Sequence, residues 1–140
     1  MKRTPLAVGG YEGKTFGRYF LARLLARGGM GIVYLGRLDG PMGFEKLVAV
    51  KVIHPELVTD RHVLSMFLDE ARLAARINHG NVCSILDFGT YRDTPYLVME
   101  YLHGATFSAM IRRCLDAGGM PPQIAAKVVA DAARGLHAAH

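Results

Sequence analysis

Two patterns of hydrophobic and polar positions alternate along this chain: short runs of the strand type and longer runs of the helical type. In the first stretch, β-branched and aromatic residues fill short runs that glycine-rich turns separate, which predicts strands. We expect three of them, at Arg18–Ala26, Gly31–Arg37 and Glu45–Val52, the last ended by His54-Pro55. Residues 1–16 carry charges, a proline and two adjacent glycines, so we expect a flexible leader there.

After the third strand the spacing becomes helical. Apolar residues recur every three or four positions, at Val63, Phe67, Ala71 or Ala74, and Ile77. This spacing puts them on one face of a helix that runs to about residue 77 and ends before Gly80. Thr59 or Asp60 can cap its first turn, because either side chain can accept hydrogen bonds from the first free backbone amides.

Two further strands and two helices complete the pattern. We expect strands at Val82–Phe88 and Tyr96–Tyr101, with Gly89 starting the turn after the first of them. Helical spacing returns over Thr106–Asp116, and Pro121-Pro122 opens a last helix that runs to the end of the sequence. The order is therefore five strands, with one helix inserted after the third, followed by helices and without an internal repeat.

The glycine-rich run Leu25–Val33, with Lys51 one hairpin later, is the strongest chemical signal in the sequence. Glycine-rich turns bind phosphates in three designs, which differ in the element that comes after the glycines. A Walker-type loop requires Gly-Lys-Ser/Thr and then a helix, and a dinucleotide-binding loop requires a helix directly after the glycines. Here Ile32–Leu35 favours a strand, which excludes both designs. The third design is a strand, a glycine turn and a strand, a hairpin that can fold over a nucleotide as a flap.

These residues resemble the protein kinase superfamily, whose pattern is Gly-x-Gly-x-x-Gly-x-Val, then Val-Ala-Ile-Lys, then a glutamate on the following helix. The matching positions here are Ala26, Gly28, Gly31 and Val33, then Val48–Lys51, then Glu70. The local sequences Gly28–Leu35 and Gly43–Leu47 resemble the bacterial serine/threonine branch of that family. One position departs from the pattern, because alanine stands at the first glycine. Alanine is tolerated where φ is negative, so we expect only a modest effect on nucleotide affinity.

The resemblance covers about residues 17–140 and implies an α+β fold. Residues 17–102 would form a protein-kinase-like small lobe, with a five-stranded antiparallel sheet, one helix and the hinge. Residues 103–140 would be the first two helices of an incomplete large lobe. In this family the catalytic loop and magnesium ligands come next, and these 140 residues contain no counterpart of either. We expect the parent enzyme to transfer the ATP γ-phosphate to protein serine or threonine, and this stretch alone to be inactive.

Lys51 lies in an apolar strand, where an unpaired ammonium group is costly to desolvate. It therefore requires anionic partners. The resemblance assigns it the α- and β-phosphates of ATP and a catalytic ion pair with Glu70, which lies nineteen residues later. The alternatives that the residues leave open are that Asp69 is the partner of this lysine, or that neither acid is.

The resemblance also implies a set of ATP-binding residues. Backbone amides of the glycine turn would hold phosphates, short apolar side chains would cover the adenine, and the hinge backbone would hydrogen-bond it. Met99 would line the back of the pocket, and Thr106 would lie near the ribose. The assigned residues are Leu25, Ala26, Arg27, Gly28, Gly29, Met30, Gly31, Val33, Ala49, Lys51, Met99, Glu100 and Leu102. Without a nucleotide, the apolar members would be ordinary core and the turn an ordinary hairpin.

Asp87–Gly89 imitates the Asp-Phe-Gly motif that binds magnesium in kinases. It precedes the hinge, whereas the family's motif lies after the catalytic loop, so we expect no metal role for it. His137 and His140 lie three residues apart, but without a third ligand they do not indicate a metal site. ATP with Mg²⁺ is the expected cofactor, the metal ligands lying beyond residue 140. A non-catalytic nucleotide-binding or regulatory kinase-like protein is the alternative.

Charge, hydropathy and cysteines bear on partners and location. The formal charge is +5, but no basic run exceeds two residues, and no aromatic stacking motif accompanies Arg112-Arg113. Solvated surface charge is therefore expected, and nucleic-acid binding is not.

No apolar run suits a signal peptide or a membrane span. Cys83 and Cys114 lack metal-ligand spacing, which indicates reduced thiols in a cytoplasmic protein. The broad apolar face of the last helix predicts self-association.

Overall fold

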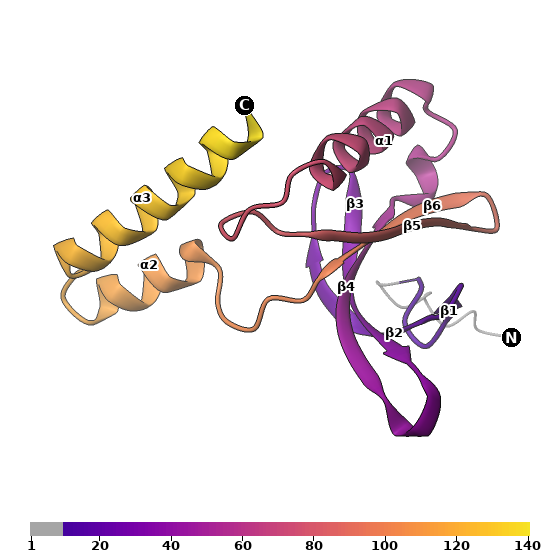
Figure 1. The fold of residues 1–140 in the computed structure, drawn as a ribbon, viewed down its shortest axis with the longest axis horizontal. Helices are drawn as coiled ribbons and strands as arrows, with labels where there is room; N and C mark the ends of the chain where they lie inside the picture. The colour runs from indigo at the N-terminus through magenta and orange to yellow at the C-terminus, as the bar shows by residue number, and fades with distance from the viewer. Residues whose placement is uncertain (1–9) are drawn as a thin grey trace, which may run out of the picture. The chain divides into compact units, whose positions relative to one another are not determined.

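The computed structural model describes residues 10–140, which form two compact units (Figure 1). The first unit comprises residues 10–76 and 84–101, and the second comprises residues 77–83 and 102–140. Residues 1–9, which make up most of the expected leader, lie outside the described residues. Within residues 10–140, none of the helices combines the length and the apolar character that crossing a membrane requires.

The first unit is built on an antiparallel sheet of six strands, in the order β1-β2-β3-β4-β6-β5. The strands are β1 (Thr15–Phe16), β2 (Tyr19–Arg27), β3 (Gly31–Asp39), β4 (Glu45–Ile53), β5 (Ile85–Tyr91) and β6 (Thr94–Glu100). Two short 3-10 helices, η1 (Pro41–Gly43) and η2 (Pro55–Leu57), flank β4. The antiparallel sheet is as expected, but its first strand was not foreseen.

That additional strand, β1, lies in the segment expected to be a flexible leader. Thr15 pairs with Phe20 and Phe16 pairs with Tyr19, and the Phe16 side chain is completely buried. Tyr11 packs edge-on against the Phe16 ring, with 5.1 Å between the ring centroids. The described part of the expected leader is therefore packed on the sheet. Its aromatic side chains supply the reason, because burying them removes large apolar areas from water.

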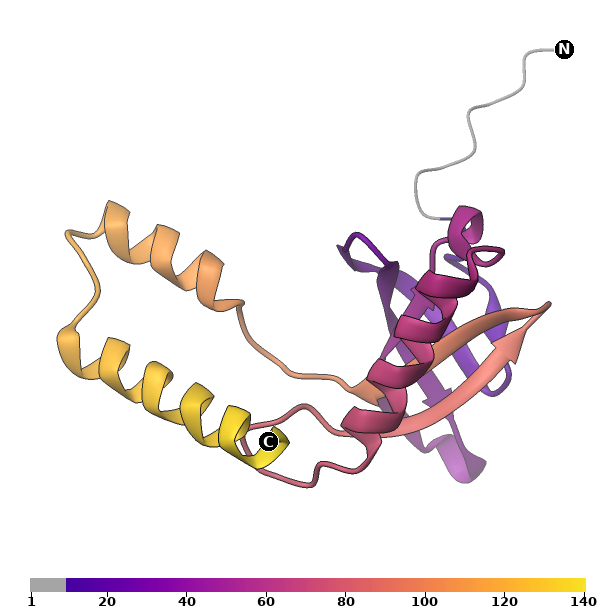
Figure 2. The ribbon, with the colours of Figure 1, turned by 90° about the horizontal axis from the view of Figure 1, so that it is seen from above.

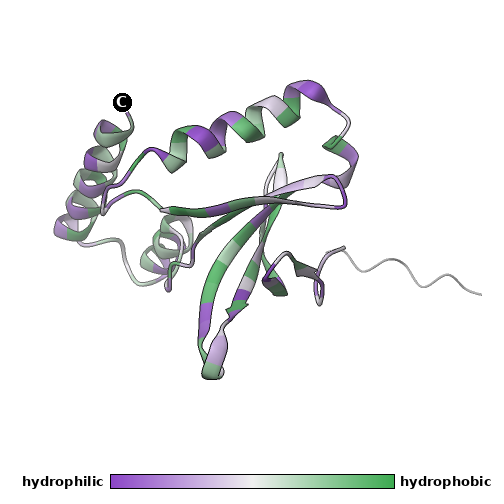
Figure 3. Cartoon of the chain, turned by 45° about the vertical axis from the view of Figure 1, so that its right-hand side comes forward, coloured by the Kyte–Doolittle hydropathy of each residue, from purple (hydrophilic) through white to green (hydrophobic). Residues whose placement is uncertain are grey.

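The two faces of the sheet carry separate cores, as strand alternation requires. In β4, Val48, Val50 and Val52 belong to a cluster that also contains four buried aromatic residues. The full cluster is Phe16, Tyr19, Leu21, Ile32, Tyr34, Val48, Val50, Val52, Tyr96 and Val98. On the opposite face, Ile53 and Leu97 pack against the helix. β4 is thus covered on both sides, and Figure 3 shows its long hydrophobic stretch.

Helix α1 (Arg61–Ala75) covers the second face (Figure 2). Asp60, and not Thr59, caps it, because its Oδ1 accepts hydrogen bonds from the His62 and Val63 amides at 2.9 and 3.2 Å. Phe67 is 1% exposed and Ala71 is 7% exposed, so Ala71 rather than Ala74 continues the buried face. The helix ends two residues before the expected Ile77.

The hairpin of β5 and β6 differs from the expectation. β5 begins at Ile85 and continues through Gly89, which pairs with Tyr96 and does not start a turn. The turn lies at Arg92 and Asp93, whose φ values of 45° and 65° suit a two-residue hairpin connection. Gly89 is required for close packing instead: a Cβ there would lie 2.5 Å from the Tyr96 hydroxyl oxygen.

The second unit contains α2 (Phe107–Asp116) and α3 (Pro122–Ala139), which run in opposite directions (Figure 1). Thr106 caps α2 by accepting a hydrogen bond from the Ala109 amide at 3.2 Å. Pro122 occupies the first position of α3, where its missing N–H costs nothing.

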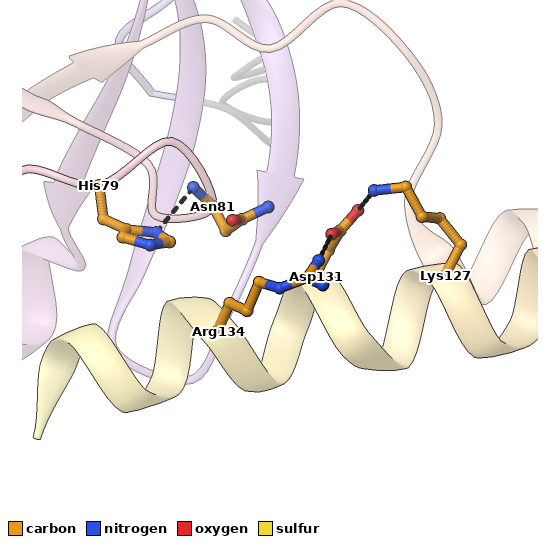
Figure 4. A network of polar contacts seen from close by, with 5 residues as sticks. All are labelled: His79, Asn81, Lys127, Asp131 and Arg134. Atoms are coloured by element: carbon orange, nitrogen blue, oxygen red, sulfur yellow. Dashed lines mark hydrogen bonds and ion pairs between the residues drawn. The ribbon is translucent and has the colours of Figure 1, made fainter.

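The connection 77–83 belongs to the second unit, although the expected division at residue 102 assigns it to the first. Gly135 of α3 is buried against it, because a Cβ on this glycine would lie 2.5 Å from the Asn81 carbonyl oxygen. Figure 4 shows this connection beside α3, with the Asn81 amide donating a hydrogen bond to His79 Nδ1 at 3.1 Å. On α3, Asp131 accepts hydrogen bonds from Lys127 and Arg134 (Figure 4), and the Lys127 bond lowers the pKa of its carboxyl group.

The Gly89→Ala substitution should destabilise the first unit by about 1–3 kcal/mol, because the added methyl group overlaps the Tyr96 hydroxyl and ring. Urea unfolding of the purified chain measures the loss. Gly10→Ala is the matched control, since a Cβ at Gly10 meets nothing within 4 Å. Equal unfolding midpoints for both variants would contradict the packing described for Gly89.

Buried tyrosines should make the fold sensitive to alkali. Burial raises the pKa of Tyr19, Tyr34 and Tyr96 above the ordinary value of 10.0, and the hydrogen bond to Asp87 raises that of Tyr19 further. Their protonated forms therefore stabilise the fold fully below pH 10, and this stabilisation is lost as the pH rises. Urea unfolding above pH 10 should show a falling free energy of unfolding, less steep in Tyr34→Phe. An identical slope in that variant would contradict the assignment.

Candidate functional site

Lys51 lies in the middle of the sheet, on the face that α1 covers. It pairs with Val33 of β3 on one side and with Leu97 of β6 on the other. Its side chain is 19% exposed, and its Nζ donates hydrogen bonds to both carboxylate oxygens of Glu70, at 2.8 and 3.0 Å. Nζ also lies 5.9 Å from the centre of the Phe67 ring. The ammonium group is thus neutralised inside an apolar surrounding.

The structure distinguishes between the two acids that the sequence left open. Glu70 is three positions after the buried Phe67, which brings it to the same side of α1. Asp69 is not bonded to Lys51; it accepts hydrogen bonds within α1, from Arg72 at 3.3 Å and from Ser65 at 3.5 Å. The Glu70 side chain is 45% exposed, so the ion pair is open to water and contributes little to stability. An ammonium group has three donors, and an incoming anion can share them.

The glycine turn connects β2 and β3 beside the lysine strand. The Gly28 amide donates a hydrogen bond to the Gly31 carbonyl at 2.8 Å, which closes the turn. A Cβ at Gly29 would meet nothing within 4 Å, whereas one at Gly31 would lie 2.5 Å from the Val52 carbonyl oxygen. The turn is therefore open at its tip and tightly seated on β4 at its end.

The apolar residues assigned to the adenine lie on the lysine face of the sheet. Val33 is opposite Lys51, and Ala49 is opposite Met99. Because opposed residues share a face, these side chains line one surface with Lys51. Ala49 is 8% exposed, and Met99 packs against the core under α1.

A β-bulge, which the sequence pattern did not reveal, sets the position of Leu25. Leu24 pairs with Tyr34 and Ala26 pairs with Val33, so Leu25 is the additional residue. In such a bulge two residues oppose one, and Leu25 and Ala26 thus share the place opposite Val33. Ala26 does not have a positive φ, so alanine is without backbone strain at the first glycine position.

The other assigned residues have different surroundings. Glu100 is held to Ser84, whose amide donates to the Glu100 carboxylate at 2.8 Å and whose carbonyl accepts from the Glu100 amide at 3.0 Å. Arg27 is exposed, and Met30 packs against the core under α1. Leu102 and Thr106 belong to the second unit, and their adenine and ribose roles stay predictions.

Asp87 has a structural partner. The hydroxyl of the buried Tyr19 donates a hydrogen bond to its Oδ2 at 2.7 Å, and Arg18 lies 3.8 Å from the same oxygen. A carboxylate that accepts from a buried hydroxyl stabilises the sheet edge. Among residues 10–140, no three histidine, cysteine, aspartate or glutamate side chains converge as metal ligands would, His137 and His140 included.

His54 makes a contact with the glycine turn that sequence reasoning missed. Its Nε2 lies 2.7 Å from the Gly28 carbonyl oxygen, and its backbone amide donates to the Met30 carbonyl at 3.1 Å. The sequence marked this histidine only as the end of the lysine strand. Its ring has no spacing signal that relates it to a turn twenty-six residues earlier.

Comparisons with known proteins agree with this geometry. The protein kinase domain model matches residues 19–140. The tyrosine-protein kinase MasK of Myxococcus xanthus (strain DK1622) is 42% identical over 126 residues, covering 89% of this chain and 20% of that protein. The serine/threonine-protein kinase PknB of Mycobacterium leprae (strain TN) is 37% identical over 127 residues, covering 88% of this chain and 20% of that protein.

A solved structure gives the same result for the fold. The kinase domain of Mycobacterium tuberculosis PknI superposes with a TM-score of 0.74 at 29% identity, covering 92% of this chain and 50% of that one. The chain thus spans about a fifth of the length of these curated relatives and half of a solved kinase domain. With the family match, the fold and the lysine–glutamate pair in agreement, the chain belongs to the protein kinase domain family and corresponds to the N-terminal region of that domain.

Proposed function

We propose that the first unit binds ATP on the face of the sheet that carries Lys51. The observation that carries the proposal is the ion pair of Lys51 with Glu70. Lys51 lies on β4, the strand against which the end of the glycine turn packs. A lysine held by a carboxylate keeps its ammonium group at a defined position, where it can attract phosphate oxygens. Backbone amides at the open turn add further donors for an anion.

The residues present suit the nucleotide but not its metal. Apolar side chains at Val33, Ala49 and Met99 share the face of Lys51, as a flat base beside charged phosphates requires. The Asp87 carboxylate accepts a hydrogen bond from Tyr19, and among residues 10–140 no three histidine, cysteine, aspartate or glutamate side chains are placed to hold a metal ion. Bound ATP would supply the phosphoryl group, and these residues would orient it. No step of metal chemistry is assigned to them.

We further propose that the parent enzyme is a cytoplasmic kinase that transfers phosphate to protein serine or threonine. The names of PknB and Pkn1, the latter 39% identical, support this acceptor, whereas MasK is named a tyrosine-protein kinase. These 140 residues contain no His-Arg-Asp sequence, so we expect them to bind ATP without transferring phosphate. The alternative, a non-catalytic regulator, has no described contact in its favour.

The second unit supports a separate proposal, self-association of the isolated chain. Of the residues in α2 and α3, only Gly135 is buried. Large apolar side chains on both helices are exposed, namely Phe107, Ile111, Leu115, Ile124, Val129 and Leu136. Apolar surface of this extent promotes association in water. We expect it to join copies of the 140-residue chain.

Lys51→Met should weaken ATP binding by about 10- to 100-fold, because a charged hydrogen bond to phosphate contributes about 1.5–3 kcal/mol. Titration of a fluorescent ATP analogue measures the dissociation constant. Lys46→Met is the matched control, since this lysine lies on β4 near Asp39 and Glu45, away from Glu70. Equal affinities of the Lys51 variant and the wild type would refute the proposed site.

Sedimentation velocity should show oligomers of the wild-type chain that grow with concentration. Leu115→Glu and Leu136→Glu should shift the distribution towards monomer, because each puts a charge into the exposed apolar surface of the second unit. Leu73→Glu changes an equally exposed leucine of α1 and should leave the distribution unchanged. A wild-type monomer at all concentrations would rule out the proposal.

A further inference from the structure

We propose that His54 is a positioning residue, which holds the glycine turn in the geometry that receives the phosphates of ATP. The inference rests on the proposed ATP-binding function and adds a residue that the family pattern of glycines, lysine and glutamate does not contain. His54 directly follows β4, and its side chain is 15% exposed. Both its side chain and its backbone contact the turn.

One residue fastens both arms of the turn. The His54 ring nitrogen Nε2 lies 2.7 Å from the Gly28 carbonyl oxygen, so Nε2–H donates to the arm that leaves β2. The His54 backbone amide donates to the Met30 carbonyl at 3.1 Å, on the arm that enters β3. Gly29, between these two contacts, stays open. The residue therefore holds the sides of the turn and leaves its tip accessible.

Such fastening matters because the turn is rich in glycine. Glycine residues lose more conformational freedom on ordering than any others, and ordering a loop on binding reduces affinity. Within the turn, the hydrogen bond from the Gly28 amide to the Gly31 carbonyl closes the loop but does not attach it to the sheet. His54 supplies that attachment before the nucleotide arrives.

The attachment also relates the turn to the lysine. His54 lies three residues after Lys51, at the end of the same strand, and Gly31 pairs with Ile53 between them. The Gly31 backbone is pressed against the Val52 carbonyl, which excludes a side chain there. The backbone amides of the turn and the ammonium group of Lys51 are thus both positioned by β4. Their separation is set in advance for one ligand that contacts both.

The required state of the imidazole is defined by its partner. The Gly28 carbonyl only accepts, so Nε2 carries the proton, in the neutral Nε2–H tautomer or in the imidazolium form. Nδ1 faces Glu56, whose Oε1 is 4.0 Å away and whose side chain is 72% exposed. Both states donate to Gly28. His54 therefore acts by positioning the turn, and this role requires a hydrogen-bond donor at the position of Nε2.

Three substitutions separate this role from general stability. His54→Gln places an amide nitrogen as many bonds from Cβ as Nε2, His54→Asn places it one bond nearer, and His54→Leu removes the donor. Dissociation constants for ATP and for adenosine are measured for each variant and for the wild type. ATP affinity should fall about three- to tenfold in the leucine and asparagine variants, the loss of one hydrogen bond, and stay within about twofold in the glutamine variant. Adenosine affinity should stay unchanged, because it lacks phosphates.

Each outcome decides a stated claim. If the wild type does not bind ATP, the proposed function fails and this inference fails with it. If the wild type binds ATP and the leucine variant binds it equally well, only the role of His54 is refuted. An equal loss for adenosine and ATP would mean a general structural effect and would also refute it. If the leucine variant does not fold, equal ATP affinity of the glutamine and asparagine variants refutes the inference.

Discussion

The arrangement of the proposed site depends on one constraint: the ammonium group of a lysine in a strand covered on both faces needs an anionic partner. Lys51 lies on β4, whose neighbours β3 and β6 complete the centre of the sheet. Its ammonium group cannot stay unpaired among the apolar side chains around it. Helix α1 supplies the carboxylate of Glu70 at 2.8 Å, and the same helix buries Phe67 and Ala71 against the sheet. Packing of Phe67 and Ala71 therefore sets the rotation of α1 about its axis, and this rotation brings Glu70 to Lys51.

The same strand organises the glycine turn. Gly31 seats against the Val52 carbonyl, and His54 bonds both arms of the turn just beyond the strand. Alternation along β4 sends valines to the aromatic core and sends Ala49, Lys51 and Ile53 to the face of α1. A small number of consecutive residues thus separates the face of the first core cluster from the face of the proposed site.

Much of this site could be predicted from the sequence, because its signals are local. The lysine on an apolar strand, the glutamate on the next helix and the helix cap at Asp60 depend on residue type and spacing. Strand β1 was missed because two residues cannot display a period. The prediction of a turn at Gly89 was wrong. This position requires glycine because the Tyr96 ring, from the neighbouring strand, leaves no room for a Cβ.

The remaining features depend on contacts that no spacing encodes. The bulge at Leu25 appears only when β2 is aligned with β3, and His54 contacts Gly28 across twenty-six residues. The connection 77–83 joins the second unit because Asn81 meets Gly135, more than fifty residues later. Chain-distant contacts of this kind arise from the completed fold, and a pattern of residue types does not contain them.

The central claim is that the glycine turn and Lys51 together receive the phosphates of ATP. Two-dimensional ¹H–¹⁵N NMR of the labelled chain tests it most directly, by titration with ATP and, in parallel, with adenosine. ATP should shift the amide signals of Gly28, Gly29, Gly31 and Lys51 far more than adenosine does. Gly118 and Gly119, in the connection between α2 and α3, should not move. Saturable ATP binding that leaves the glycine turn unshifted would contradict the account.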